Sequence, residues 1–296
     1  MEYRVLKYFL AVAREENITK ASEVLHLSQP ALSRQLMQLE EELGTELFIR
    51  GKRRITLTPA GILLRRRALE IIELTEKAGR EIRSQEGELA GVISIGSGEG
   101  ETFRLFSRLM VNFQEQHPRV KFDLYTNNGD FIRERLERGL LDIGIIFKPR
   151  DLEKYSYLKL PDRERCGVIV PADSPLASKE SVTPEDLIGQ NILLSKRAET
   201  LGFARWAGEC FAKYTIPVTY NLVYNAALLV SQGAGIAQTI EGAVSLYRNP
   251  DILFKPFYPP LEITSCMVWK KNQPQPPATA SFIAYVKQQL TGGSPE

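Results

Sequence analysis

A helix that begins at Ser28 is the feature that most limits what this chain can fold into. Ser28 is a favoured N-cap residue, and Pro30 falls in the first turn, where its missing N–H costs no hydrogen bond. Gly44 stands where a C-cap is expected. Between them, leucines recur at spacings of four, three and four residues, on one side of a helix: Leu32, Leu36, Leu39 and Leu43. This segment is therefore predicted to pack against a core.

The opposite side of this helix carries side chains that suit DNA bases. Gln29, Ser33 and Arg34 lie off the leucine stripe and within about one turn of one another. Gln and Arg have paired hydrogen-bonding groups that match the edges of adenine and guanine in the major groove. A polar helix face by itself is more often only solvated, so the neighbouring segments decide between the two interpretations.

Two segments before Ser28 complete a helix-turn-helix pattern. Residues 4–15 have helical periodicity, and residues 19–25 form a short second helix. His26 and Leu27 then make the tight turn into the helix that follows. The residues expected to face the core are Leu6, Phe9, Leu10, Ala13, Ala21, Val24 and Leu25.

A basic β-ribbon is expected after the third helix, with Gly51 at its tip. Residues 50–67 contain no Asp or Glu. Positive charge beside a base-contacting helix suits phosphate contacts, which supply affinity and set the register without recognising sequence. The residues expected at the DNA backbone or in an adjacent minor groove are Arg50, Lys52, Arg53 and Arg54.

Residues 1 to about 60 resemble the DNA-binding domain of LysR-type transcriptional regulators. The resemblance is carried by residues 21–35, 39–44, 47–48 and 57–61, which follow the order and spacing of the family's signature. Beyond residue 90 it rests on the general layout and on local patterns such as residues 140–145. It implies a winged helix-turn-helix in which the residues that contact double-stranded DNA are Thr19, Ser28, Gln29, Pro30, Ser33, Arg34, Gln35, Arg50, Lys52, Arg53 and Arg54.

Length and composition agree with a regulator of this kind. The chain has 296 residues, of which 43% are hydrophobic, which is enough for two or three domains with cores. The net charge of +2 is too small to indicate nucleic-acid binding by itself, because the basic charge is local. No apolar stretch approaches the roughly 20 residues of a membrane span, and residues 1–4 have no signal-peptide layout. We therefore expect a cytoplasmic protein without a membrane partner.

A long helix is expected from residue 58 to about residue 85. Its apolar positions alternate spacings of four and three, as in a coiled coil: Leu64, Ala68, Ile71, Thr75, Ala78 and Ile82. Packing against the chain's own domains gives the same pattern. The family resemblance implies that this linker pairs antiparallel with that of a second subunit, in a homodimer or homotetramer. A dimer places two base-contacting helices on an inverted repeat.

From Gly91 onward the chain alternates strands and helices, which is typical of parallel sheets covered by helices. A first half is expected to contain residues 90–161 together with 266–296, including a final helix at 278–290, and a second half residues 162–265. In the second half, strands are expected at 168–170, 192–194, 220–223 and 235–237, and helices near 183–187, 202–214, 226–232 and 240–247. This arrangement resembles the family's effector domain and the periplasmic-binding-protein fold.

The predicted fold class is therefore α/β, with an N-terminal winged helix-turn-helix, a linker helix and a two-subdomain effector domain. The expected boundaries are 1–57 for the DNA-binding domain, 58–89 for the linker and 90–296 for the effector domain. The expected function is a sequence-specific DNA-binding regulator modulated by a small effector. A solute-binding module and an α/β enzyme that uses the same cleft remain alternatives.

Ligands of open α/β sheets bind beyond the carboxyl ends of the strands, and this rule predicts the effector pocket. Lys196 and Arg197 favour a carboxylate ligand, whereas Glu99 and Glu101 favour an amine or a polyol. Each polar loop residue there is equally suited to a cap or turn role. The candidate effector-binding residues are Ser97, Glu101, Thr102, Asn128, Phe147, Lys196, Arg197, Phe203, Asn225 and Gln238.

The chain lacks the sequence patterns of several catalytic and cofactor sites. Its glycine-rich residues 96–100 have Glu101 where a dinucleotide fingerprint needs glycine, and it has no nucleophile elbow, zinc-protease or P-loop motif. We therefore expect no enzymatic activity, cofactor or metal. Cys166 and Cys266 fall near the two segments that join the halves, so a disulfide switch is one hypothesis. Two half-buried residues in strands are the simpler interpretation, and Cys210 is expected to pack on a helix.

Overall fold

The structure is a computed structural model that describes residues 1–51, 54–83, 89–147, 153–198, 202–245 and 249–291. The chain forms two compact units, residues 1–83 and 84–296. Lys52 and Arg53, two of the residues expected at the DNA backbone, lie outside the described residues.

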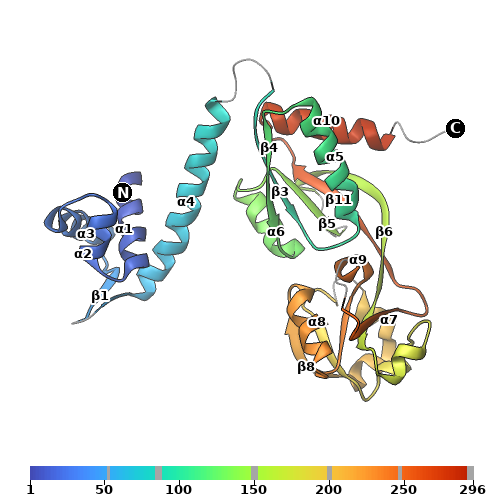
Figure 1. Cartoon of the computed structure of the whole chain (residues 1–296). Coiled ribbons are helices and arrows are strands. Elements are labelled where there is room, and N and C mark those ends of the chain that lie inside the picture. The colour runs from blue at the N-terminus through green and yellow to red at the C-terminus, as the bar shows by residue number, and fades with distance from the viewer. Residues whose placement is uncertain (52–53, 84–88, 148–152, 199–201, 246–248, 292–296) are drawn as a thin grey trace. The chain divides into compact units, whose positions relative to one another are not determined.

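The first unit is a winged helix-turn-helix (Figure 1). Helices α1 (Tyr3–Glu15), α2 (Ile18–Val24) and α3 (Gln29–Leu43) are followed by the hairpin of β1 (Phe48–Arg50) and β2 (Ile55–Leu57), and then by α4 (Pro59–Arg83). The core contains most of the residues expected there: Leu6, Phe9, Ala21, Leu32, Leu36 and Leu39, with Leu10, Ala13 and Leu25 packed at its edge. The predicted helix-turn-helix and ribbon are confirmed.

Local predictions at the helix ends hold in part. Gly44 adopts a φ of 66°, the left-handed C-cap geometry that glycine permits. Ser28 occupies the N-cap position, but its side chain makes no capping hydrogen bond with the described residues. Leu43 and Val24 were predicted to be buried and are instead 40% and 50% exposed. Each is the last residue of its helix, where the chain turns away and leaves the final side chain with fewer core neighbours.

Helix α4 divides its apolar residues between two sides. Ala68 is fully buried in the unit's own core, and Leu64 packs at the edge of that core. The prediction that these two residues lie in a dimer seam is therefore wrong. The reason is that α4 packs against α1, which covers this side of the helix. Other seam positions, Ile71, Thr75 and Ala78, are exposed, and the side chain of Ile82 lies outside the described residues.

The second unit contains one continuous sheet with two halves. In the first half, β3 (Gly91–Ser97) lies parallel to β4 (Val120–Thr126) and to β5 (Ile143–Phe147). Helices α5 (Thr102–Gln116), α6 (Gly129–Glu137) and α10 (Pro277–Thr291) belong to this half (Figure 1). The final helix packs on the first half as predicted, since Phe282 shares a core with Phe106 and Phe113.

Two long strands connect the halves. Strand β6 (Tyr155–Pro171) is 17 residues long and pairs with β11 (Glu262–Lys270). The second half adds β7 (Asn191–Ser195), β8 (Thr215–Tyr220), β9 (Ile236–Ile240) and β10 (Ile252–Pro256), in the order β4-β3-β5-β11-β6-β9-β7-β8, with β10 paired to β6. The sequence indicated only residues 168–170 of β6, because the charged residues 162–165 interrupt its apolar pattern.

Several elements of the second half differ from their predictions. The expected helix at 183–187 is a short 3₁₀ helix (Glu185–Leu187), and that at 202–214 is α7 (Phe203–Ala207) followed by a 3₁₀ helix (Gly208–Lys213). The expected strand at 220–223 ends at Tyr220, and α8 (Val223–Ser231) begins in its place. Pro217 weakened the strand pattern, but β8 is an edge strand, where a missing N–H is tolerated. Helix α9 (Glu241–Val244) is shorter than predicted.

The hypothesis of a disulfide between Cys166 and Cys266 is wrong, and the simpler interpretation of two packed residues in strands is confirmed. Both cysteines are buried thiols that form no disulfide, and they belong to different core clusters. The register pairs Cys266 with Lys159, seven residues before Cys166 on β6. At about 3.3 Å per residue this separation is roughly 20 Å, far beyond disulfide reach. Burial also raises the pKa of Cys166 to about 12, which keeps it a thiol.

Candidate functional site

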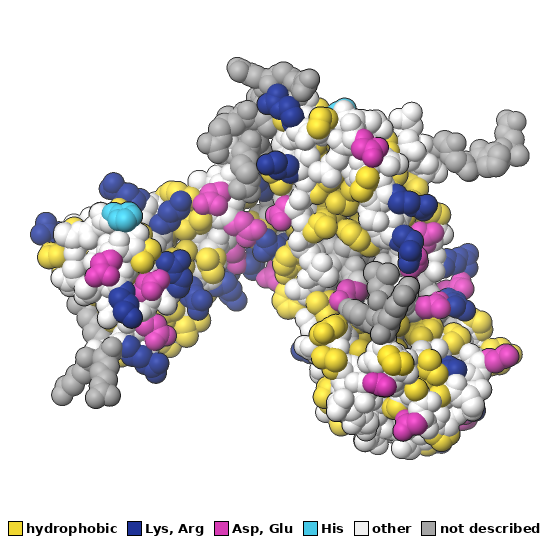
Figure 2. All heavy atoms as spheres, viewed as in Figure 1, with side chains coloured by type: hydrophobic (Ala, Val, Ile, Leu, Met, Phe, Trp, Pro, Cys, Tyr) yellow, Lys and Arg dark blue, Asp and Glu magenta, His cyan; other side chains and the backbone are white. Residues whose placement is uncertain are grey.

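The exposed side of α3 forms the candidate DNA-binding surface. Gln29 and Arg34 are exposed and Ser33 is half-buried, and Gln29 Nε2 donates a hydrogen bond to Ser33 Oγ at 3.3 Å. Pro30, at the start of the helix, is exposed beside them. On the face drawn in Figure 2, Lys and Arg side chains of this unit are interspersed with hydrophobic and acidic ones.

The remaining candidate DNA-binding residues belong to α2, to α3 with its N-cap and to the β1–β2 ribbon. Thr19 and Ser28 are exposed, whereas Gln35 is half-buried and donates a hydrogen bond to Gln38 Oε1 at 3.0 Å. Arg54 is exposed directly before β2, and its guanidinium lies 3.7 Å from Glu16 Oε2. Arg50 ends β1, and its side chain lies outside the described residues.

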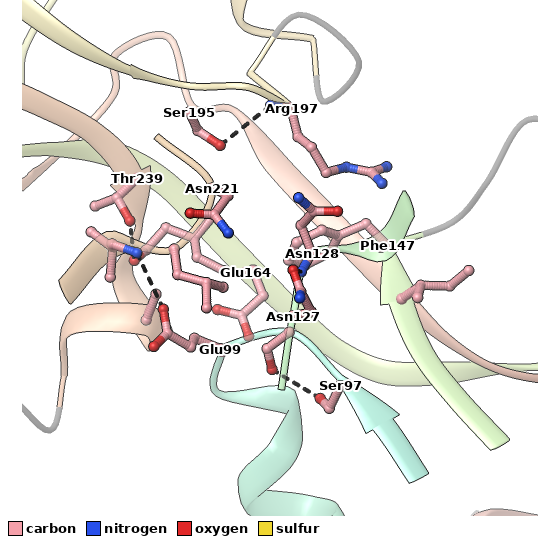
Figure 3. Close-up of a pocket in the computed structure, with 18 of the residues that line it drawn as sticks. Ser97, Glu99, Asn127, Asn128, Phe147, Glu164, Ser195, Arg197, Asn221 and Thr239 are labelled. Atoms are coloured by element: carbon pink, nitrogen blue, oxygen red, sulfur yellow. Dashed lines mark hydrogen bonds between the residues drawn. The ribbon is translucent and has the colours of Figure 1, made fainter. Parts of the chain in front are cut away.

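A pocket lies between the two halves of the second unit (Figure 3). It contains about 780 Å³ of empty space, part of it open to solvent. It lies beyond the carboxyl ends of β3, β5, β7 and β8, as the rule for open α/β sheets predicts. The structure brings together six of the candidate effector-binding residues in its walls: Ser97, Thr102, Asn128, Phe147, Arg197 and Gln238.

The other four candidates lie outside the pocket walls. Glu101 points to Arg104, with which it forms an ion pair, and Lys196 is exposed. Phe203 is fully buried in the core of the second half, stacked near Trp206 and Phe257. Asn225 is exposed on α8, because the strand that was expected to end just before it ends at Tyr220.

Residues that were not predicted contribute to the same walls. Asn221 lines the pocket directly after β8, at the position that the misplaced strand end had given to Asn225. Glu164 lines it from the middle of β6, where no strand ends. Glu164 was not predicted because the rule for open α/β sheets places ligands only beyond the ends of strands. The position of Asn221 follows once β8 is placed correctly.

Glu164 is the most buried charged group of the pocket. Its Oε1 accepts a hydrogen bond from Thr102 N at 3.0 Å and lies 3.4 Å from Thr102 Oγ1, which donates to it. Burial raises the pKa of Glu164 above its usual range, although the N–H groups of Thr102, Glu101 and Gly242 oppose that shift. A Cβ at position 242 would lie 2.6 Å from Glu164 Oε2 and 2.1 Å from Glu101 N, so glycine is required there.

Two contacts cross the pocket between the halves. Arg197, which follows β7, places Nη1 3.0 Å from Asp130 Oδ1 in the first turn of α6. Glu99, in the loop after β3, accepts a hydrogen bond from Val223 N at the start of α8, at 3.3 Å. Burial lowers the pKa of Arg197, whereas Asp130 raises it. The pose of the two halves is therefore held in part by polar side chains that a ligand can contact or displace.

Thr102→Val is expected to destabilise the second unit. The Thr102 hydroxyl is buried and lies within hydrogen-bond distance of both Glu164 Oε1 and Ser265 Oγ, which is 3.1 Å away. Valine preserves the shape but leaves those two groups with one partner fewer, so we expect a loss of about 1–3 kcal/mol in the free energy of unfolding. Urea denaturation measures it. Thr126→Val, at an exposed site, is the control, and equal losses in both variants would contradict this role for Thr102.

Two family models match the chain. The LysR substrate binding domain matches residues 86–291, and the bacterial regulatory helix-turn-helix protein, lysR family, matches residues 3–62. The chain belongs to the LysR family. Its relatives include the Hca operon transcriptional activator HcaR of Escherichia coli, 31% identical with 98% of each chain covered. Another is the uncharacterized HTH-type transcriptional regulator YybE of Bacillus subtilis, 30% identical with 97% of this chain and 98% of the other covered.

Solved structures of LysR-family proteins have the same fold. The regulator CbnR is 26% identical over 98% of this chain and 99% of its own, with a TM-score of 0.76. Full-length BenM, 24% identical over 99% of this chain and 96% of its own, has a TM-score of 0.56. This LysR-family protein is therefore a transcriptional regulator and not an enzyme, and the solute-binding alternative is not favoured.

Within the described part of the chain, no helix is both long enough and apolar enough to span a bilayer. Over the same residues, no group of three or more His, Cys, Asp or Glu side chains is arranged to hold a metal ion.

Proposed function

We propose that this LysR-family regulator binds DNA through α3 and the β1–β2 ribbon, and that a small molecule in the pocket of the second unit modulates this binding. The observation that carries the effector proposal is that side chains of both halves, such as Asn128 and Arg197, line one pocket. A ligand that contacts both halves favours one relative pose over another, which is the energetic requirement for regulation. We further propose that the protein works in the cytoplasm, where it reaches DNA.

The buried polar atoms of the pocket favour a ligand that has both an acceptor and a donor. Arg197 Nε and Gln238 Oε1 are buried and have no hydrogen-bond partner among the described residues. Leaving such atoms unpaired costs about 1–3 kcal/mol each, so a ligand that pairs with them gains affinity. A small polar acid that also carries a hydroxyl or amino group has both kinds of atom.

The effector proposal is tested by comparing variants of pocket residues with variants of nearby residues outside the pocket walls. A metabolite library is screened by thermal shift, and the affinity of each stabilising compound is measured by calorimetry. Asn221→Ala and Arg197→Gln should weaken binding about five- to tenfold, which corresponds to one lost hydrogen bond. Asn225→Ala and Lys196→Gln, at exposed sites outside the pocket walls, should leave the affinity unchanged. Loss of binding only in this second pair would overturn the pocket assignment.

We also propose that the protein is a dimer joined through α4. The support is an apolar stripe that the unit's own core leaves uncovered: Leu63, Ile71 and Leu74 are large, exposed and on one side of the helix, with Ala78 beside them. Leu69 is also exposed, but it lies on the opposite side, which becomes polar from Glu73 onward. The ion pair of Arg67 and Glu70 lies on the same side between Leu63 and Ile71, so the apolar stripe is continuous only from Ile71 to Ala78. An exposed apolar helix face favours pairing with another helix.

A further inference from the structure

Met37 is a large apolar side chain on the DNA-facing side of α3. It is 43% exposed, whereas its neighbours Leu36 and Leu39 are buried in the core of the first unit. It follows Ser33 by four residues and Arg34 by three, so it lies next to both on the helix surface. Met37 is therefore surrounded by the polar residues of the candidate DNA-binding surface and is not part of the core.

The position of Met37 limits what it can contact on DNA. Base edges in the major groove present hydrogen-bonding groups, and the apolar group among them is the C5-methyl of thymine. A thioether side chain is flexible and polarisable, so it adapts its shape to such a methyl group. Sugars and phosphates give an apolar side chain no comparable base-specific partner.

We propose that Met37 recognises thymine by contacting its 5-methyl group in the major groove. This inference rests on the proposed DNA-binding function of α3. Three residues of helix rise about 4.5 Å, so we expect the thymine within one or two base pairs of the base that Arg34 contacts. Met37 then adds an apolar base contact, with its own sequence preference, to the hydrogen bonds that the polar residues of α3 make.

The test removes the methyl group from the DNA and the side chain from the protein. The full-length protein first selects sites from a library of random duplexes, and each thymine in the selected half-site is then replaced singly by deoxyuridine. One replacement should weaken binding of the wild-type protein about fourfold, the effect of one buried methyl group, as measured by fluorescence anisotropy. Met37→Ala should weaken binding to the thymine duplex by at least that factor and show no further loss with deoxyuridine.

Two controls separate this contact from a general effect. Gln38→Ala, at the adjacent exposed position, should keep the full deoxyuridine effect, and Met37→Leu should keep part of it. A wild-type protein that is insensitive to every thymine replacement overturns the proposal, as does a Met37→Ala variant that keeps the full sensitivity. If the wild-type protein enriches no sequence at all, the proposed DNA-binding function itself fails, and this outcome is distinct from the other two.

Discussion

Ile71→Glu is expected to convert the proposed dimer to monomers and to weaken DNA binding although α3 is unchanged. Ile71 is 38% exposed in the single subunit and lies on the apolar stripe with Leu63 and Leu74. In a paired helix, the substitution buries a carboxylate without a partner, which costs about 3–5 kcal/mol. Since a dimer places two α3 helices on one operator, its loss removes the second half-site from binding.

Sedimentation equilibrium measures the first effect and anisotropy on an inverted-repeat duplex measures the second. Leu69→Glu is the matched control, because it introduces the same charge at an exposed leucine on the opposite side of α4. We expect that variant to remain dimeric. An Ile71→Glu protein that sediments as a dimer would show that the stripe of Leu63, Ile71 and Leu74 is not the contact between subunits.

Arg34→Ala is expected to weaken binding to the selected site by about 1–3 kcal/mol, or roughly 5- to 150-fold, and to relax the base preference at one position. Arg34 is exposed at the second turn of α3, where a bidentate contact to guanine explains such an effect. Binding to random duplexes should change little, because that binding comes from phosphate contacts. Equal losses on selected and random duplexes would show that Arg34 contacts only phosphate.

Arg54→Ala is expected to weaken binding to selected and random duplexes alike, in contrast to Arg34→Ala. Arg54 is exposed on the ribbon, and its nearest acidic partner, Glu16, is also exposed. Loss of one phosphate contact should weaken binding to all duplexes alike and lower the slope of log K against log salt by about 0.9. Titrations at four salt concentrations measure that slope. An unchanged slope would mean that Arg54 makes no phosphate contact.

Features that depend on near neighbours in the chain were predicted well. The end of α3 at Gly44, the ribbon at Gly51 and the span of α10 follow from caps, glycine and helical spacing. The errors arose where local pattern and tertiary context disagree. Val223 begins a buried helix face, yet its apolar neighbours gave a strand pattern, and this shift of a few residues moved the expected pocket residue from Asn221 to Asn225.

The sequence by itself determined the winged helix-turn-helix, the α/β alternation and most of the strand ends that surround the pocket, but not that of β8, because each helix or strand is encoded within a short run of consecutive residues. Only the tertiary structure decided which side of α4 its own core covers and which groups meet across the pocket. Glu164 meets Thr102 from 62 positions away, and Arg197 meets Asp130 from 67 positions away. Such pairs depend on the register of β6 with β11 and on how the two halves close, and no local periodicity carries that information.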